Sequence, residues 1–156
     1  MKLKGIRPIN NCLNKFMREW GLTAEIGTDF AYLYEKQVVV WTPIVSAQND
    51  LDFQKFFESL GCNVKCDVFL YSILHEIGHS QTLDLVNDED YAYSLDRKAE
   101  PISNYEYFRL PDEIIATQWA VDFLNENTEK VRLFWEEFVP LMMQFYEKNN
   151  IEIEEN

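Results

Sequence analysis

Apolar residues recur every three or four positions in several stretches of the chain, a spacing that predicts amphipathic helices. The first such stretch covers residues 10–20, where Asn10 or Asn11 can cap the helix and Gly21 can end it. Its apolar face consists of Leu13, Phe16, Met17 and Trp20. A second helix is expected over 49–61, with phenylalanines along one side.

Between these helices the pattern changes to short apolar runs. In residues 30–42, aromatic and β-branched residues lie on either side of Glu35 and Lys36. This arrangement predicts two short antiparallel strands, closed by Pro43.

The stretch 66–81 is apolar nearly all round, which predicts a helix in the middle of the domain with Asp67 as its N-cap. A polar connection is expected over 82–109, because that region has no sustained apolar period.

Another helix is expected to begin at Pro111, and an amphipathic helix over 128–148 follows, which Pro140 can kink. The absence of repeats and linkers predicts a single domain over 1–156, with a frayed tail at about 150–156. The expected fold class is α+β: a mostly helical domain with a small antiparallel sheet before the 66–81 helix.

Composition narrows the class of protein. The chain has 156 residues, of which 47% are hydrophobic, enough for one domain with a core. There is no apolar run of membrane-spanning length and no apolar segment behind the N-terminal lysines, so a cytoplasmic protein is expected. Three cysteines are too few for a disulfide framework, and Cys62 and Cys66 have no further cysteine or third histidine to complete a cysteine-rich zinc site.

The formal net charge is −13, which disfavours direct binding to nucleic acids. A surface that keeps the domain in solution is the simplest explanation of this charge. A second explanation is a DNA mimic that occupies the basic groove of a DNA-binding protein.

Both histidines of the chain lie in the apolar 66–81 stretch, as the sequence His75-Glu76-Ile77-Gly78-His79. Residues four apart share a helix face, so two imidazoles can bind one zinc ion. Glu76 is offset around the helix and can take a proton from the water that zinc activates. Gly78 leaves room for substrate or a packed helix. The alternative is a histidine pair without metal, which would leave two imidazoles in an apolar helix without evident partners.

A catalytic zinc site usually has three protein ligands, so a third must come from elsewhere, a carboxylate or, less readily, a cysteine. Glu113 differs from the other acids because it begins an apolar helix face that continues with Ala116 and Ala120. A glutamate that merely favours the helix N-terminus is the alternative. The other downstream carboxylates are Asp84, Asp88, Glu89, Asp90, Asp96, Glu100, Glu106, Asp112 and Asp122.

Two segments carry a resemblance to a known family. The sequence YSILHEIGH resembles the active-site helix of the ImmA/IrrE-type zinc metallopeptidases, and EIIATQWAVDFL (113–124) is similar to their second motif, E-x-x-A-N-x-F-A-x-x-L-L. The resemblance implies a zincin-like fold in which His75, His79 and Glu113 bind one zinc ion and Glu76 is the catalytic base. Thr117 stands where the family usually has asparagine.

The expected function is therefore zinc-dependent hydrolysis of a peptide bond in a protein or peptide, and the resemblance implies a regulatory protein as substrate. Candidates for stabilising the oxyanion are Tyr91, Tyr93, Tyr105, Tyr107 and Arg109. Two alternatives are a catalytically silent binding protein that traps a regulatory or host protein, and the acidic DNA mimic. Neither a membrane nor a nucleic acid is expected as a direct partner.

Overall fold

The structure is a computed structural model that describes residues 3–44 and 47–151, and the side chains of 47–50 lie outside this description. Its contacts divide it into two compact units, Met1–Ala47 with Asn127–Asn156, and Gln48–Glu126. About 65% of the structure is helical and a small mixed sheet is present, so the expected α+β class with mostly helical content is confirmed. The single domain stays a prediction.

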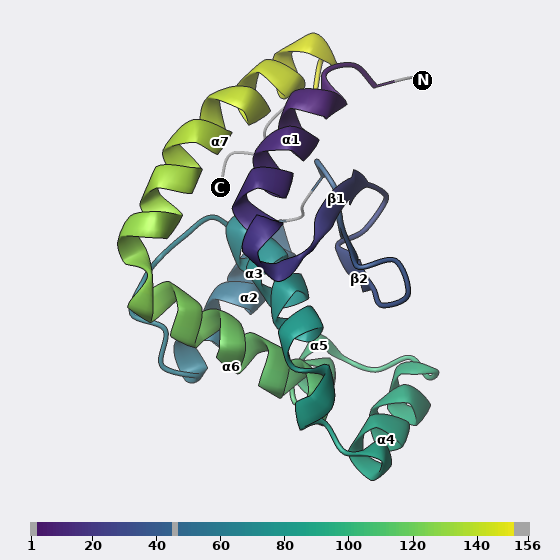
Figure 1. The fold of residues 1–156 in the computed structure, drawn as a ribbon. Coiled ribbons are helices and arrows are strands. Elements are labelled where there is room, and N and C mark those ends of the chain that lie inside the picture. The colour runs from purple at the N-terminus through teal and green to yellow at the C-terminus, as the bar shows by residue number, and fades with distance from the viewer. Residues whose placement is uncertain (1–2, 45–46, 152–156) are drawn as a thin grey trace. The chain divides into compact units, whose positions relative to one another are not determined.

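In the first unit, helix α1 (Ile6–Met17) continues into the short η1 (Arg18–Trp20) and packs against α7 (Thr128–Lys148) (Figure 1). Both helices were predicted, and Pro140 does lie inside α7. The interface is aromatic: the rings of Phe16 and Phe134 stack with centroids 4.1 Å apart. The predicted frayed tail falls largely on 152–156, outside the described residues.

The predicted start of α1 is wrong. The helix begins one turn earlier, at Ile6, and its N-cap is Gly5, which has a left-handed backbone conformation with φ of 80°. Pro8 is accommodated because amides in the first turn have no intrahelical partner. Asn10 therefore lies inside the helix, where its side chain accepts a hydrogen bond from the indole of Trp41 at 2.7 Å. Gly21, with φ 69°, ends η1 as expected.

The sheet has the strand order β1-β3-β2 and comprises β1 (Thr23–Ile26), β2 (Ala31–Leu33) and β3 (Val38–Trp41). The predicted antiparallel pair is confirmed as β2 and β3. The expectation of a purely antiparallel sheet is wrong, because β1 pairs with β3 in parallel. Strand β1 is short and has one buried residue, Ala24, so its sequence shows little of the apolar pattern of a strand. Asn14 Oδ1 accepts a hydrogen bond from the Ala24 amide at 2.7 Å.

The second unit contains helices α2 to α6. Their bounds, with the short η2, are α2 (Ala47–Ser59), α3 (Val68–Gln81), η2 (Leu83–Leu85), α4 (Asp88–Lys98), α5 (Asn104–Tyr107) and α6 (Pro111–Glu126). The predicted cap of α3 is confirmed, since Asp67 accepts a hydrogen bond from the Phe69 amide at 2.8 Å.

The prediction of a polar connection over 82–109 is wrong, because this region contains α4 and α5. Side chains start both helices: Asn87 caps α4 and Ser103 caps α5. Helix α4 is largely exposed and buries one residue, Ser94, so it shows little of the apolar period on which the prediction depended.

Helices α3 and α6 lie side by side within this unit (Figure 1). Their backbones approach closely, because a Cβ atom added at Gly78 would lie 2.2 Å from the carbonyl oxygen of Ala116. Ala116 and Ala120 are fully buried. The expectation that Gly78 leaves room for a packed helix is confirmed.

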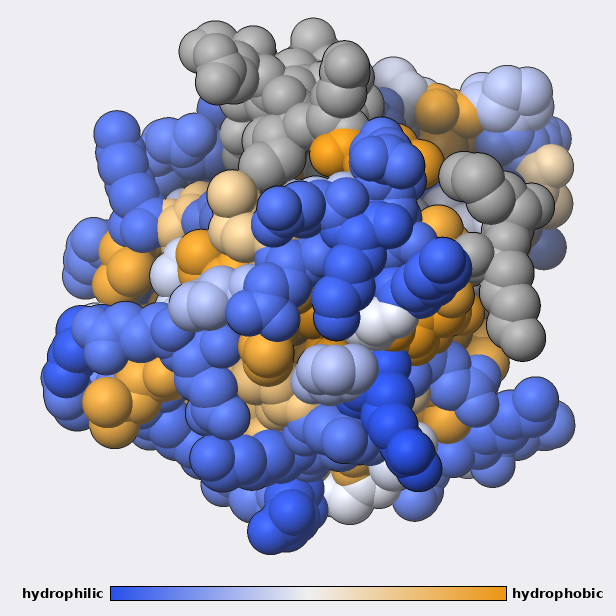
Figure 2. All heavy atoms as spheres, turned by 90° about the horizontal axis from the view of Figure 1, so that it is seen from above, coloured by the Kyte–Doolittle hydropathy of each residue, from blue (hydrophilic) through white to orange (hydrophobic). Residues whose placement is uncertain are grey.

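Hydrophilic residues cover most of the face shown in Figure 2, with hydrophobic residues between them. Among the helices of the described residues, none combines the length and the apolar character needed to cross a lipid bilayer.

Candidate metal centre

The two histidines project from α3 on the side that faces α6. His75 is buried, with 2% of its side chain exposed, and His79 is one turn further along with 18% exposed. Their rings lie edge to face with centroids 4.6 Å apart, and the ring of Phe53 packs against His75. The i, i+4 spacing thus directs both imidazoles to one point, as the sequence predicted.

Glu113 reaches this point from the first turn of α6. Its Oε2 atom lies 2.7 Å from Nε2 of His75 and 2.8 Å from Nε2 of His79, and the two nitrogens are 3.1 Å apart. Glu113 is 1% exposed. The structure therefore brings together the three residues that the sequence singled out as ligands, and they form the group of potential metal ligands found among the described residues.

The geometry fits a small divalent cation. In a tetrahedral zinc site with bonds of 2.0–2.1 Å, ligand atoms are about 3.3 Å apart, so a slight outward shift of the three atoms would admit the ion. Burial alone would raise the pKa of Glu113, but interactions with His75 and His79 outweigh it and hold the pKa well below its usual range. Glu113 is thus a carboxylate with the charge that a metal ligand needs.

Thr117 orients the first histidine. Its hydroxyl lies 2.7 Å from Nδ1 of His75, and the residue is fully buried one turn after Glu113 on the same face of α6. When Nδ1–H donates to this oxygen, Nε2 of the neutral ring carries a lone pair that faces the Glu113 carboxylate. In that tautomer, a cation bound by both atoms would stabilise their 2.7 Å approach. The sequence showed Thr117 as a departure from the family motif and did not reveal this contact.

Lys98 supplies a cation that sequence reasoning missed. From the last turn of α4, its Nζ atom lies 2.7 Å from Asp112 Oδ2 and 3.0 Å from Glu113 Oε1. Burial lowers the pKa of Lys98, but the two carboxylates outweigh this effect and raise it. Lys98 therefore offsets part of the negative charge that Asp112 and Glu113 bring to the site.

Glu76 and Tyr107 complete the polar surroundings. Burial raises the pKa of Glu76, although His75 and His79 oppose the shift. Burial, followed by the charge of Glu113 and a hydrogen bond with it, raises the pKa of Tyr107, and the charge of Glu76 adds to the effect. A raised pKa makes Glu76 a better proton acceptor and keeps Tyr107 protonated.

The other candidates are placed differently. Arg109 stacks on the ring of Tyr105, 3.4 Å from its centroid, and donates to that residue's carbonyl. The exposed tyrosines among the oxyanion candidates are Tyr91, Tyr93 and Tyr105. The carboxylates that lie exposed are Asp84, Asp88, Glu89, Asp96, Glu100 and Asp122. Glu106 is paired with Arg97.

The cysteines do not join the site. All three are free, and the Sγ atom of Cys62 donates to the Val64 carbonyl at 3.3 Å. Burial raises the pKa of Cys66 to about 12, which keeps it a neutral thiol and a poor ligand at neutral pH.

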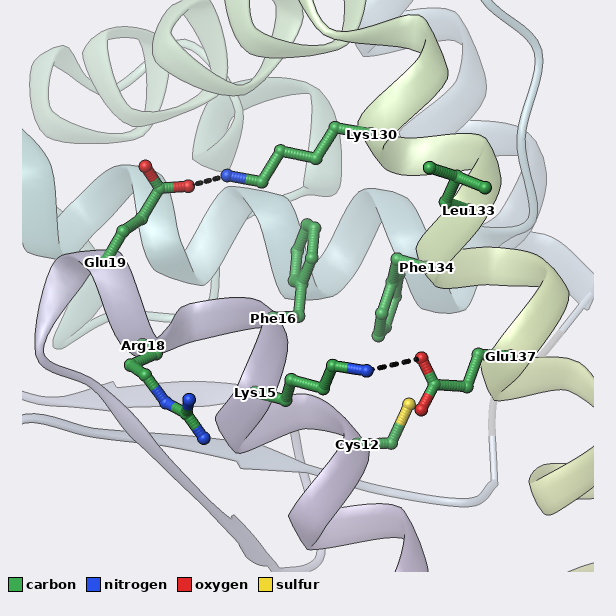
Figure 3. A pocket seen from close by; sticks show the side chains of 9 residues that line it. All are labelled: Cys12, Lys15, Phe16, Arg18, Glu19, Lys130, Leu133, Phe134 and Glu137. Carbon is green, nitrogen blue, oxygen red and sulfur yellow. Dashed lines mark hydrogen bonds and ion pairs between the residues drawn. The ribbon is translucent and has the colours of Figure 1, made fainter.

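The first unit has a hollow between α1 and α7 (Figure 3). The stacked rings of Phe16 and Phe134 lie between two ion pairs that link the helices. These pairs are Lys15 with Glu137 and Lys130 with Glu19. Its lysines are therefore already neutralised, and its one thiol, Cys12, is buried.

Comparison of the chain with models of protein families, with curated proteins and with solved structures finds no match.

Proposed function

We propose that this chain is a zinc-dependent peptidase of the ImmA/IrrE type that hydrolyses a peptide bond in a protein substrate. The observation that carries the proposal is the convergence of His75, His79 and Glu113, whose three ligand atoms lie within 3.1 Å of one another. Zinc is the favoured ion, because two imidazoles and one carboxylate form a ligand set typical of catalytic zinc sites.

His75, His79 and Glu113 would hold a zinc ion, which would supply a Lewis acid for the substrate carbonyl and for the attacking water. The buried Thr117 hydroxyl keeps the His75 ring in the orientation that presents Nε2 to the site.

Glu76 is the proposed general base. It directly follows His75 on α3 and is not one of the three proposed ligands, so its carboxylate is free to act on a water molecule. Because desolvation raises its pKa, its carboxylate accepts a proton from water more readily than an exposed glutamate would. The same carboxylic acid can later return the proton to the leaving amine.

Tyr107 is the oxyanion candidate that lies beside the site, because its ring centroid is 5.4 Å from the ammonium of Lys98. Burial and the charge of Glu113 raise its pKa, so the phenol stays protonated. A phenol there can donate a hydrogen bond to the oxygen that gains negative charge as the carbonyl is attacked.

The test is the Glu76→Gln variant, which keeps the shape of the side chain and removes the base. We expect the wild type to cleave members of a fluorogenic peptide library, and the variant to bind the same amount of zinc but to cleave at least about 100-fold more slowly. Glu58→Gln, on α2, is the matched control and should retain activity. Equal cleavage by Glu76→Gln would contradict the proposal. Zinc binding by both proteins with no cleavage by either would instead favour a catalytically silent binding protein.

A further inference from the structure

We infer that Lys98 is a positioning residue that restricts Glu113 to one metal-binding oxygen, an inference that rests on the proposed zinc site. The two oxygens of Glu113 have different neighbours. Oε2 faces the Nε2 atoms of His75 and His79, whereas Oε1 lies 3.0 Å from the ammonium of Lys98.

This division decides how many positions around the metal the protein occupies. A carboxylate can bind a metal ion through one oxygen or through both. With Oε1 beside Lys98, Glu113 would offer one ligand atom, and the two histidines would offer one each. Three protein ligands would leave room for water, which hydrolysis at a zinc site requires.

Lys98 is itself held firmly. Asp112 Oδ2 lies 2.7 Å from its Nζ atom, and the ammonium lies 5.4 Å from the ring centroid of Tyr107. The second oxygen of Asp112 is buried and has no hydrogen-bond partner among the described residues. The partner of the Asp112 carboxylate is therefore Lys98. This ion pair holds the ammonium of Lys98, a residue of α4, beside Oε1 of Glu113.

The charge of Lys98 would also act on a bound metal ion. A positive charge beside the Glu113 carboxylate would repel the ion and withdraw electron density from this ligand, which would weaken metal binding and make the ion a stronger Lewis acid. Removal of Lys98 should therefore strengthen zinc binding while it changes the coordination. If Lys98 were needed only for folding, its removal would weaken zinc binding instead.

The test compares wild type, Lys98→Met and Lys98→Arg, with Lys55→Met as control because Lys55 is an exposed lysine of the same unit. Zinc affinity is measured by competition with a chromogenic chelator, and coordination by the visible absorption of bound Co²⁺. That absorption is intense for four-coordinate Co²⁺ and several-fold weaker for five-coordinate Co²⁺. We expect Lys98→Met to bind zinc about tenfold more tightly or more, with the weak five-coordinate spectrum. Lys98→Arg and Lys55→Met should resemble the wild type.

An unchanged Co²⁺ spectrum in Lys98→Met, or zinc binding no tighter than that of the wild type, would overturn the inference and leave the zinc site itself intact. A wild type that binds neither metal would overturn the proposed function and this inference with it. If Lys98→Met fails to fold by circular dichroism, Asp112→Asn decides: it removes a negative charge, while the asparagine oxygen can still accept a hydrogen bond from Lys98 and leave it beside Glu113. We then expect several-fold weaker zinc binding with the wild-type spectrum, and unaltered affinity or a five-coordinate spectrum would contradict the inference.

Discussion

The hydroxyl of Thr117 lies 2.7 Å from Nδ1 of His75, so a residue of α6 fixes the orientation of an imidazole on α3. Thr117 and Glu113 lie one turn apart on α6, so this helix supplies both the third proposed ligand and the group that orients the first. The site is therefore assembled by the packing of two helices, and changes in either helix should be measurable as changes in metal affinity.

Replacement of Thr117 by valine removes the hydroxyl and nearly preserves the shape. We expect zinc affinity to fall by about 10- to 100-fold, because outer contacts of a metal-binding histidine typically have effects of this size. Chelator competition measures the affinity. Thr117→Ser, which keeps the hydroxyl, should stay within a few-fold of the wild type, and equal affinities in the wild type and Thr117→Val would show that the contact does not orient the ring.

Gly78→Ala tests the close packing of α3 on α6. In an exposed helix this change stabilises a protein by about 1 kcal/mol. Here the new methyl group would lie 2.2 Å from the Ala116 carbonyl oxygen, so the helices must separate. We expect the free energy of unfolding to fall by about 1–3 kcal/mol, as is typical of overpacked cores, and zinc affinity to fall with it. Urea denaturation measures the first, and an increase in stability would contradict the close approach.

The thiols provide a prediction about pH. Burial raises the pKa of Cys12 from 9.0 to about 11 and that of Cys66 to about 12. Because these folded-state pKa values are raised, the stability that the neutral thiols contribute is fully present below pH 9.0 and is lost as the pH rises toward 11. Urea denaturation should therefore show decreasing stability over that range, and substitution of Cys12 by alanine should reduce the decrease.

Alkylation separates the cysteines from the metal site. At pH 8 we expect iodoacetamide to react much more slowly with Cys12 and Cys66 in the folded protein than in the urea-unfolded protein, because few thiolates are present. Alkylation of Cys62, the remaining thiol, should leave zinc content unchanged. Loss of zinc in step with alkylation would instead place a cysteine among the ligands.

Local patterns in the sequence were sufficient to predict which side chains converge in the candidate site. His75 and His79 share a helix face because of their spacing alone, and the buried stripe after Glu113 indicated an inward carboxylate. Helix α3, its Asp67 cap, and the β2–β3 pair were predicted for the same reason: each depends on residues that are close in the sequence.

The rest depends on tertiary contacts that leave little trace in a local pattern. Helix α4 is mostly exposed and its sequence resembles a polar loop, so the position of Lys98 beside Glu113 could not be predicted. Strand β1 is defined by its pairing with β3 rather than by an apolar run. The contact of Thr117 with His75 joins residues 42 positions apart and becomes visible only when α3 and α6 are packed.

The most direct measurement is the zinc content of protein purified without chelator or histidine tag, for the wild type, Glu113→Ala and Asp122→Ala. Asp122 is an exposed carboxylate on the same helix and serves as the matched control. The proposed site predicts about one zinc ion per chain in the wild type and in Asp122→Ala, and little or none in Glu113→Ala. A wild type that holds no zinc after the metal is supplied, or a Glu113→Ala variant that holds it equally well, would contradict the three-ligand metal site.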